Sequence, residues 1–207
     1  MRRRNVHNAH ERLLNAAPLV VLEPTSYKGK WQSLFGNDNE IHLEIGMGKG
    51  KFIIELARRN PNINYLGLEK YESVLIQACD KLKDNYPANL HFICFDANNL
   101  NELFKEKEIK KLYLNFSDPW PKSRHAKRRL TSSIFLNQYK TIIDGEIEFK
   151  TDNRPLFEYS IISLNDFHAT FLDLSLDLHS REEDIITTEY EDKFSQKGVI
   201  YFIRFTL

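Results

Sequence analysis

The sequence predicts an α/β protein whose Rossmann-like, mostly parallel sheet carries helices on both faces. Apolar strand segments and helical patterns alternate from residue 41 to residue 164, as in a sheet built from parallel crossover units. A glycine-rich turn, Gly46-Met-Gly-Lys-Gly50, joins the first strand directly to a helix start, where free backbone N–H groups gather. Two closing apolar segments have no convincing helix between them and predict an antiparallel hairpin at one edge. We therefore expect one seven-stranded sheet.

The elements are expected in the following order. Residues 1–40 lack a strong period and predict an arm or lid, mostly loop, with one short helix at 11–17 that stops before Pro18. Residues 41–207 predict a single domain. Its expected strands are 41–45, 64–68, 90–95, 111–116, 145–150, 167–176 and 198–207. Its expected helices begin near residue 52 and span 72–85, 99–107, 132–142 and 153–164.

Charge is balanced overall but polarised along the chain. The 207 residues carry 29 basic and 29 acidic side chains, and a net charge of zero taken alone argues against a nucleic-acid binder. However, basic residues gather at 2–4 and 122–129 and acidic ones at 173–192. A polyanion responds to the local patch, so RNA binding stays open.

Composition also indicates in which compartment the protein is found and whether it binds a metal. No apolar run approaches the ~20 residues that span a bilayer, so no membrane partner is expected. Cys79 and Cys94 lack metal-ligand spacing and predict buried thiols in a reducing compartment. We expect a cytoplasmic protein without a metal.

Four acids stand at or near the ends of the first four predicted strands: Glu44, Glu69, Asp96 and Asp118. Each alone could be a cap or turn residue. Together they point to the ligand edge of an open α/β sheet, outside the carboxyl ends of the strands. Lys51 stands where a dinucleotide fingerprint would need its third glycine, and carboxylates would repel a pyrophosphate. A cationic ligand such as S-adenosylmethionine fits better.

The segment 115–130 links the fourth strand to a run of positive charge. Pro119 and Pro121 flank Trp120 and exclude both strand and helix. We expect a stiff, extended loop that presents an acid, an aromatic ring and cations to a polyanion. The alternative is a proline-rich turn before a solvated basic helix. Trp120 either stacks on a base or anchors the loop by packing.

Several motifs carry a family resemblance over nearly the whole chain. They are Glu44-Ile-Gly-Met-Gly-Lys-Gly50, Glu69, Asp118-Pro-Trp-Pro-Lys-x-Arg-His-x-Lys-Arg-Arg-Leu130, Thr151-Asp-Asn153 and Thr188-x-Tyr-Glu191. The chain resembles the bacterial tRNA (guanine-N7-)-methyltransferases, a class I S-adenosylmethionine-dependent family. The Asp-Pro-Trp-Pro block is specific, whereas the glycine turn is generic to methyltransferases. One departure from the family pattern is Asp144-Gly145, where a longer glycine-rich turn is expected before the fifth strand. This difference in loop length affects no proposed site residue.

The resemblance implies methyl transfer from S-adenosylmethionine to N7 of a guanine in the tRNA variable loop (position 46), by a monomer or homodimer. Asp118 is the catalytic candidate, because the purine becomes cationic as it is methylated. The expected cofactor residues are Glu44, Gly46, Gly48, Gly50, Glu69, Asp96, Asn98 and Asp118. The expected substrate residues are Lys122, Asp152, Thr188, Tyr190 and Glu191. The expected RNA contacts are Arg124, His125, Lys127, Arg128 and Arg129, with the basic arm at 2–4.

Three other classes remain open. An exocyclic-amine nucleic-acid methyltransferase would carry Asx-Pro-Pro-aromatic after the fourth strand, where this chain has Trp120 in place of the second proline. A non-catalytic RNA-binding module would bind RNA but not the cofactor. A nicotinamide oxidoreductase is disfavoured by Lys51 and by the acidic pocket.

Overall fold

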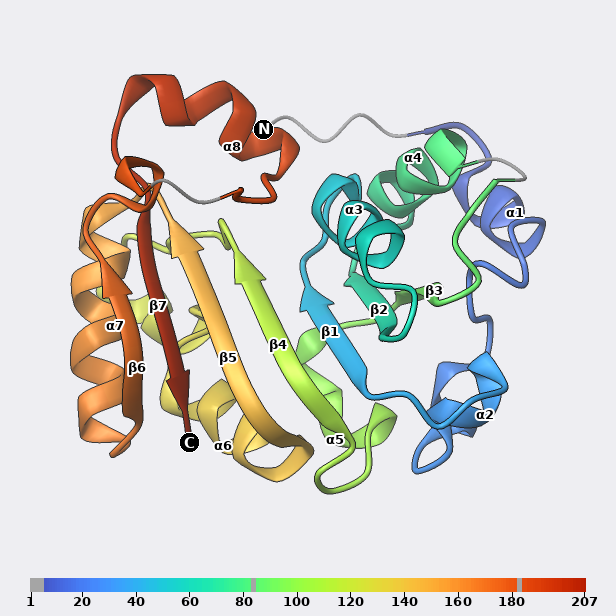
Figure 1. Ribbon diagram of the computed structural model, residues 1–207, viewed down its shortest axis with the longest axis horizontal. Coiled ribbons are helices and arrows are strands. Elements are labelled where there is room, and N and C mark those ends of the chain that lie inside the picture. Colours follow the sequence, from blue (N-terminus) through green and yellow to red (C-terminus); the bar gives the residue numbers. More distant parts are fainter. Residues whose placement is uncertain (1–5, 83–84, 182–183) are drawn as a thin grey trace.

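The fold is a seven-stranded sheet in the order β3-β2-β1-β4-β5-β7-β6 (Figure 1). The computed structural model describes residues 6–82, 85–181 and 184–207. Strands β1 to β5 run parallel, and β7 pairs antiparallel with both β5 and β6. This confirms the predicted mostly parallel sheet with an antiparallel edge hairpin. The strands are β1 Ile41–Ile45, β2 Asn64–Glu69, β3 Leu90–Cys94, β4 Ile109–Asn115, β5 Ile143–Thr151, β6 Thr170–Ser175 and β7 Tyr201–Thr206.

Helices cover both faces of this sheet, as the sequence predicts (Figure 1). They divide the apolar residues into two main clusters, one under α3 and α4 and the other under α5, α6 and α7. Every residue of β1 and β2 is buried, which is the pattern of parallel strands covered on both sides. The α-helices are α1 Ala9–Leu14, α2 Trp31–Phe35, α3 Lys51–Arg59, α4 Glu72–Leu82, α5 Leu100–Leu103, α6 Ser133–Ile142, α7 Arg154–Asp166 and α8 Glu189–Phe194. Strand order reverses between β1 and β4, so the carboxyl ends of these two strands mark the topological switch point.

The N-terminal segment packs on the sheet more closely than a loop would. Val20 forms a parallel bridge with Phe92 of β3, and residues 24–27 and 31–35 form short helices that hydrophobic periodicity does not predict. Trp31 is fully buried, and its indole N–H donates to the Leu103 carbonyl at 2.9 Å. Helices of four or five residues are too short to show a period. The basic residues 2–4 lie outside the described residues.

The connection between β6 and β7 also contains more structure than expected. It holds the turn of 3₁₀ helix η4 (Leu178–Ser180), helix α8 and the 3₁₀ turn η5 (Ser195–Lys197). Helix α8 lies at the end of the sheet toward which the β4 and β5 arrows point (Figure 1). Among the described residues, no helix is both long and apolar enough to cross a membrane.

Candidate active site

Glu44 lies at the switch point, at the carboxyl end of β1. Its side chain is buried, and Oε1 accepts a hydrogen bond from Asn115 Nδ2 at 2.9 Å. Burial raises the pKa of Glu44 to about 7, although the Asn115 hydrogen bond opposes the rise. Glu44 Oε2, Asn115 Oδ1 and Ser117 Oγ are buried without a hydrogen-bond partner among the described residues. Unpaired buried polar atoms are costly, so this group of oxygens suits a ligand that brings hydrogen-bond donors and positive charge.

The glycine turn lies directly beside Glu44. Gly46, Gly48 and Gly50 have φ values of 74°, 59° and 77°, which glycine adopts without the steric cost of a Cβ. The N–H groups of Gly46 and Met47 donate to the Leu68 carbonyl at 2.8 and 3.1 Å, which ties the turn to the end of β2. A Cβ added at Gly46 or Gly48 would meet no atom within 4 Å. The turn therefore offers a clear backbone surface for a ligand.

Glu69 and Asp96 continue the acidic edge along β2 and β3. Glu69 accepts hydrogen bonds from the backbone N–H groups of Gly48 at 3.2 Å and Tyr71 at 3.0 Å, so it braces the glycine turn. Asp96 accepts from both the backbone and side-chain nitrogens of Asn98 and pairs with Lys70 Nζ at 2.5 Å. Burial acts to raise the pKa of Asp96, but the Lys70 and Asn98 hydrogen bonds outweigh it and lower the pKa. Three of the four acids thus lie at or just after the carboxyl ends of neighbouring strands, at one edge of the sheet.

Asp118, the fourth acid, is exposed on the loop that follows β4. This loop is neither helix nor strand over 118–122, as predicted, but it is not extended throughout. Phe116 and Trp120 adopt left-handed conformations with φ of 50° and 43°, which non-glycine residues rarely take. The Arg129 guanidinium donates to the carbonyls of Pro119 at 3.2 Å and Trp120 at 3.0 Å. Such contacts from a distant residue can hold a strained backbone that the prolines alone do not impose.

The basic residues of the loop divide into two groups. Arg129 also stacks on the Tyr159 ring at 4.2 Å, while Arg128 and His125 contact the Trp120 ring at 4.8 and 5.6 Å. The side chains of this first group therefore contact Trp120, the loop backbone or the Tyr159 ring of α7. The second group is exposed, without an ion-pair partner within the described ranges, and consists of Lys122, Arg124 and Lys127.

Asp152 and Tyr190 come together across the site. The Tyr190 hydroxyl donates to Asp152 Oδ2 at 2.8 Å, and burial, followed by the bond to Asp152, raises the pKa of Tyr190 to about 12. The Tyr190 ring also stacks on Phe194 at 4.3 Å and contacts Phe116 at 5.1 Å. Since Phe116 precedes Asp118 by two residues, the ends of β4 and β5 and helix α8 meet here.

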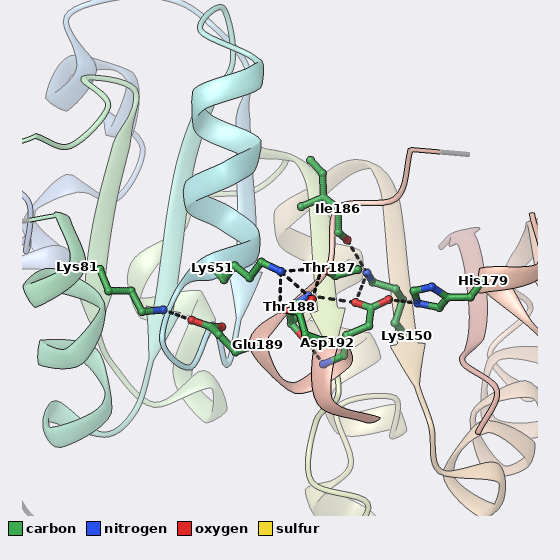
Figure 2. A network of polar contacts seen from close by, with 10 residues as sticks. Lys51, Lys81, Lys150, His179, Ile186, Thr187, Thr188, Glu189 and Asp192 are labelled. Atoms are coloured by element: carbon green, nitrogen blue, oxygen red, sulfur yellow. Dashed lines mark hydrogen bonds and ion pairs between the residues drawn. The ribbon is translucent and has the colours of Figure 1, made fainter. Parts of the chain in front are cut away.

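Thr188 and Glu191, also expected to bind substrate, form bonds within the protein. The Thr188 hydroxyl accepts from the Glu191 N–H, and the Glu191 carboxylate accepts from the Thr188 N–H, a capping box that starts α8. Glu191 is fully buried; Lys150 Nζ and His179 Nε2 each lie 2.9 Å from one of its carboxylate oxygens (Figure 2). Sequence reasoning missed Lys150 and His179. A lysine at the end of a central strand of a parallel sheet, whose two faces are both covered, is the signal that could have indicated the first.

Metal coordination finds no support in the described part of the chain. There, no group of three or more His, Cys, Asp or Glu side chains is arranged to hold an ion. Cys79 and Cys94 are free thiols, and burial raises the pKa of each, to about 12 and about 11.

Comparison with known proteins agrees with this geometry. Residues 38–202 match the model of a family described as "Putative methyltransferase". The tRNA (guanine-N(7)-)-methyltransferase of Geobacillus sp. (strain WCH70) is 51% identical over 201 residues, covering 96% of this chain and 91% of the relative. The enzyme of the same description from Bacillus subtilis (strain 168) is 49% identical over 201 residues, covering 96% and 94%.

Solved structures show the fold. An antibiotic-related methyltransferase aligns with a TM-score of 0.63 at 17% identity over 86% of this chain and 92% of that one. The 16S rRNA methyltransferase KamB aligns with a TM-score of 0.63 at 15% identity over 85% and 91%. The predicted Rossmann-like class I methyltransferase fold is confirmed. With half of its residues identical to the curated relatives over nearly its full length, the chain belongs to the tRNA (guanine-N(7)-)-methyltransferase family.

Proposed function

We propose that this protein transfers a methyl group from S-adenosylmethionine to N7 of a guanine in the variable loop of tRNA, giving 7-methylguanosine. The observation that carries the proposal is the loop after β4, which joins the acidic switch-point edge to an exposed basic surface through one residue, Asp118. Relatives at about half identity bear the name of this activity. A tRNA substrate would be met in the cytoplasm, and the protein would act as a monomer or homodimer.

The acidic edge would hold the cofactor. The unpaired oxygens at the ends of β1 and β4 and the carboxylates around the glycine turn complement an ammonium group, ribose hydroxyls and a sulfonium. When bound there, the cofactor supplies an electrophilic methyl group. The residues that would contact it are Glu44, Gly46, Gly48, Gly50, Glu69, Asp96, Asn98 and Asp118.

Little acid–base chemistry is needed at the target atom. Guanine N7 has a free lone pair, so an in-line displacement requires no strong general base and depends on positioning. The purine acquires positive charge as the N7–methyl bond forms. The exposed carboxylate of Asp118 would stabilise that charge.

Asp152 is the best-placed group to select guanine. Its Oδ2 is fixed by the Tyr190 hydroxyl, which leaves its other oxygen to accept from guanine N1–H or the 2-amino group. Glu191 is less suited to this role in the observed conformation, because Lys150 and His179 already bind its buried carboxylate. Guanine N7 lies in the deep groove of A-form RNA, so the base must be flipped out or presented by the tRNA fold.

The cations that have no side-chain contact within the described residues of the loop would bind the phosphates, and those that contact Trp120 or the loop backbone would shape the loop. The cations that would bind phosphate are Lys122, Arg124 and Lys127. Arg128 and Arg129 would instead act through Trp120 and the loop backbone. The basic residues 2–4 would extend the same surface as part of an N-terminal arm.

Methyl transfer to unmodified tRNA from labelled cofactor tests the proposal. After borohydride and aniline treatment, chain cleavage at the labelled guanine is the expected result. We expect Asp118→Asn to lower kcat by about 10²–10³-fold while the Kd for tRNA stays within about threefold. Asp166→Asn, an exposed acid at the end of α7, is the matched control and should leave both unchanged. Label on RNA that resists cleavage would instead support the exocyclic-amine class.

A further inference from the structure

The segment 184–197, here called the strap, crosses from β7 to the helices that follow the glycine turn. Three of its acids pair with cations of α3 and α4: Asp184 with Arg59, Glu189 with Lys81 and Asp192 with Lys51. The last two pairs are drawn in Figure 2. Lys51 Nζ lies 2.7 and 2.5 Å from the two Asp192 oxygens and donates to Thr187 Oγ1 at 2.8 Å. The bond from Lys51, followed by a hydrogen bond that the Thr187 hydroxyl donates to Asp192 Oδ1 at 2.6 Å, lowers the pKa of Asp192.

The two attachments of the strap differ in strength. On the β5 side, Glu191 and Lys150 are 0% and 5% exposed, and breaking a buried pair of this kind is costly. On the α3 side, Lys51 and Asp192 are 39% and 45% exposed, and such a pair contributes only about 0–1 kcal/mol. The strap can therefore release α3 and α4 while it stays anchored to β5.

The weaker attachment reaches the proposed cofactor turn. Lys51 directly follows Gly50, and Lys81 Nζ donates to the Lys49 carbonyl at 2.8 Å as well as pairing with Glu189. On the same strap, Tyr190 donates to Asp152, the group proposed to select guanine. One continuous segment thus touches the cofactor turn and the substrate-facing side chains.

We propose that Lys51 is a positioning residue that links the cofactor turn to the guanine-selecting side chains by holding the strap closed. The inference rests on the proposed function, because it assigns the turn to S-adenosylmethionine and Asp152 to the base. A cofactor that orders the turn favours the closed strap, and by linkage the closed strap strengthens cofactor binding by the same factor. Because the contacts are exposed, we expect a factor near the low end of the usual range, about fivefold.

Limited trypsin digestion of the full chain measures strap opening without turnover. Lys193 and Lys197 are exposed cleavage sites within the strap, and mass spectrometry identifies cuts there. S-adenosylhomocysteine should slow these cuts about fivefold in the wild type. In Lys51→Met the cuts should be fast with or without the ligand, and the Kd for S-adenosylhomocysteine should rise about fivefold by calorimetry.

Four variants separate positioning from general disruption. Lys51→Arg should restore protection, Asp192→Asn should reproduce the loss, and combining Asp192→Asn with Lys51→Met should add nothing. Arg58→Met removes an exposed α3 cation that has no partner among the described residues and should behave as wild type. With tRNA, Lys51→Met should raise KM more than it lowers kcat, since Asp118 is untouched.

The outcomes separate this inference from the proposed function. If Lys51→Met keeps ligand-dependent protection, or if the ligand protects no strap site in the wild type, the inference is overturned even where tRNA is methylated at N7. If protection depends on Lys51 but no 7-methylguanosine forms, the coupling stands and the substrate assignment fails.

Discussion

The buried pair beneath the strap permits a quantitative test. Lys150 Nζ donates to Glu191 Oε2 at 2.9 Å and to the Ile186 carbonyl at 3.1 Å, with both charged side chains at most 5% exposed. Lys150→Met removes the lysine ammonium from the buried Glu191 carboxylate and leaves His179 as its side-chain partner, which should lower the free energy of unfolding by about 3–5 kcal/mol. In a chain of this length 1 kcal/mol corresponds to about 2–4 °C, so the Tm should fall by roughly 6–20 °C. Urea denaturation and calorimetry provide the two values.

A second substitution checks that charge burial is the cause. Replacing Lys150 and Glu191 together by Met should recover most of the loss, because no uncompensated charge then remains. Arg154→Met, which breaks a solvent-exposed pair with Glu158, should leave the free energy of unfolding close to the wild-type value. Trypsin cleavage after Lys193 shows whether the strap opens before the sheet unfolds. A loss below about 1 kcal/mol in Lys150→Met, with the strap still protected, would refute the reasoning.

Three further predictions concern other parts of the molecule. The pKa of Glu44 rises from 4.5 to about 7 on folding, so the folded state binds the proton more tightly and stability falls as pH rises through that window. The fall should be about 2–3 kcal/mol between pH 5 and 8 by urea denaturation, and Glu44→Gln should abolish it. Arg124→Ala with Lys127→Ala should reduce the slope of log affinity for tRNA against log salt by about 1.5–2 in filter binding; an unchanged slope would remove both from the RNA surface. In Gly145→Ala the new Cβ would lie 2.1 Å from the Lys110 carbonyl oxygen, so calorimetry should show a loss of about 3 kcal/mol, and a wild-type Tm would mean that β4 and β5 separate easily.

The alternation of strand and helix patterns and the position of the glycine turn predict the central sheet, because both follow from general rules of how strands and helices connect. Parallel strands need crossovers, crossovers are right-handed, and the strand that ends in a glycine turn lies at the switch point. The expected strands therefore lie within one or two residues of β1 to β5 at most ends. That Glu44, Glu69 and Asp96 meet at one edge follows from the same geometry.

The partners of the charged residues could not be predicted in the same way. Arg129 looks like one more cation of a basic run, yet its guanidinium binds two carbonyls about ten residues earlier in the chain. Glu191 looks like an acid of a solvated segment, yet it pairs with Lys150, 41 positions away. A sequence shows that a charge exists, but only tertiary packing decides whether water, RNA or another side chain neutralises it. The short helices α2 and α8 are not predicted by the sequence for a related reason. They are stabilised by packing and capping and are too short to show a hydrophobic period in the sequence.

The pairing of residues 19–21 with β3 has a consequence for handling the protein. The Val21 N–H donates to the Phe92 carbonyl at 2.9 Å, and the Phe92 N–H donates to the Leu19 carbonyl at 2.8 Å. These bonds occupy hydrogen-bonding groups that an exposed edge strand would offer to other molecules. A fragment that begins at residue 41 would keep the glycine turn and all four strand-end acids but would expose β3 and the apolar surface beneath Trp31. Such a fragment should aggregate during expression. A tag placed before residue 6 would instead keep residues 19–21 paired with β3, which prevents that strand from pairing with another molecule.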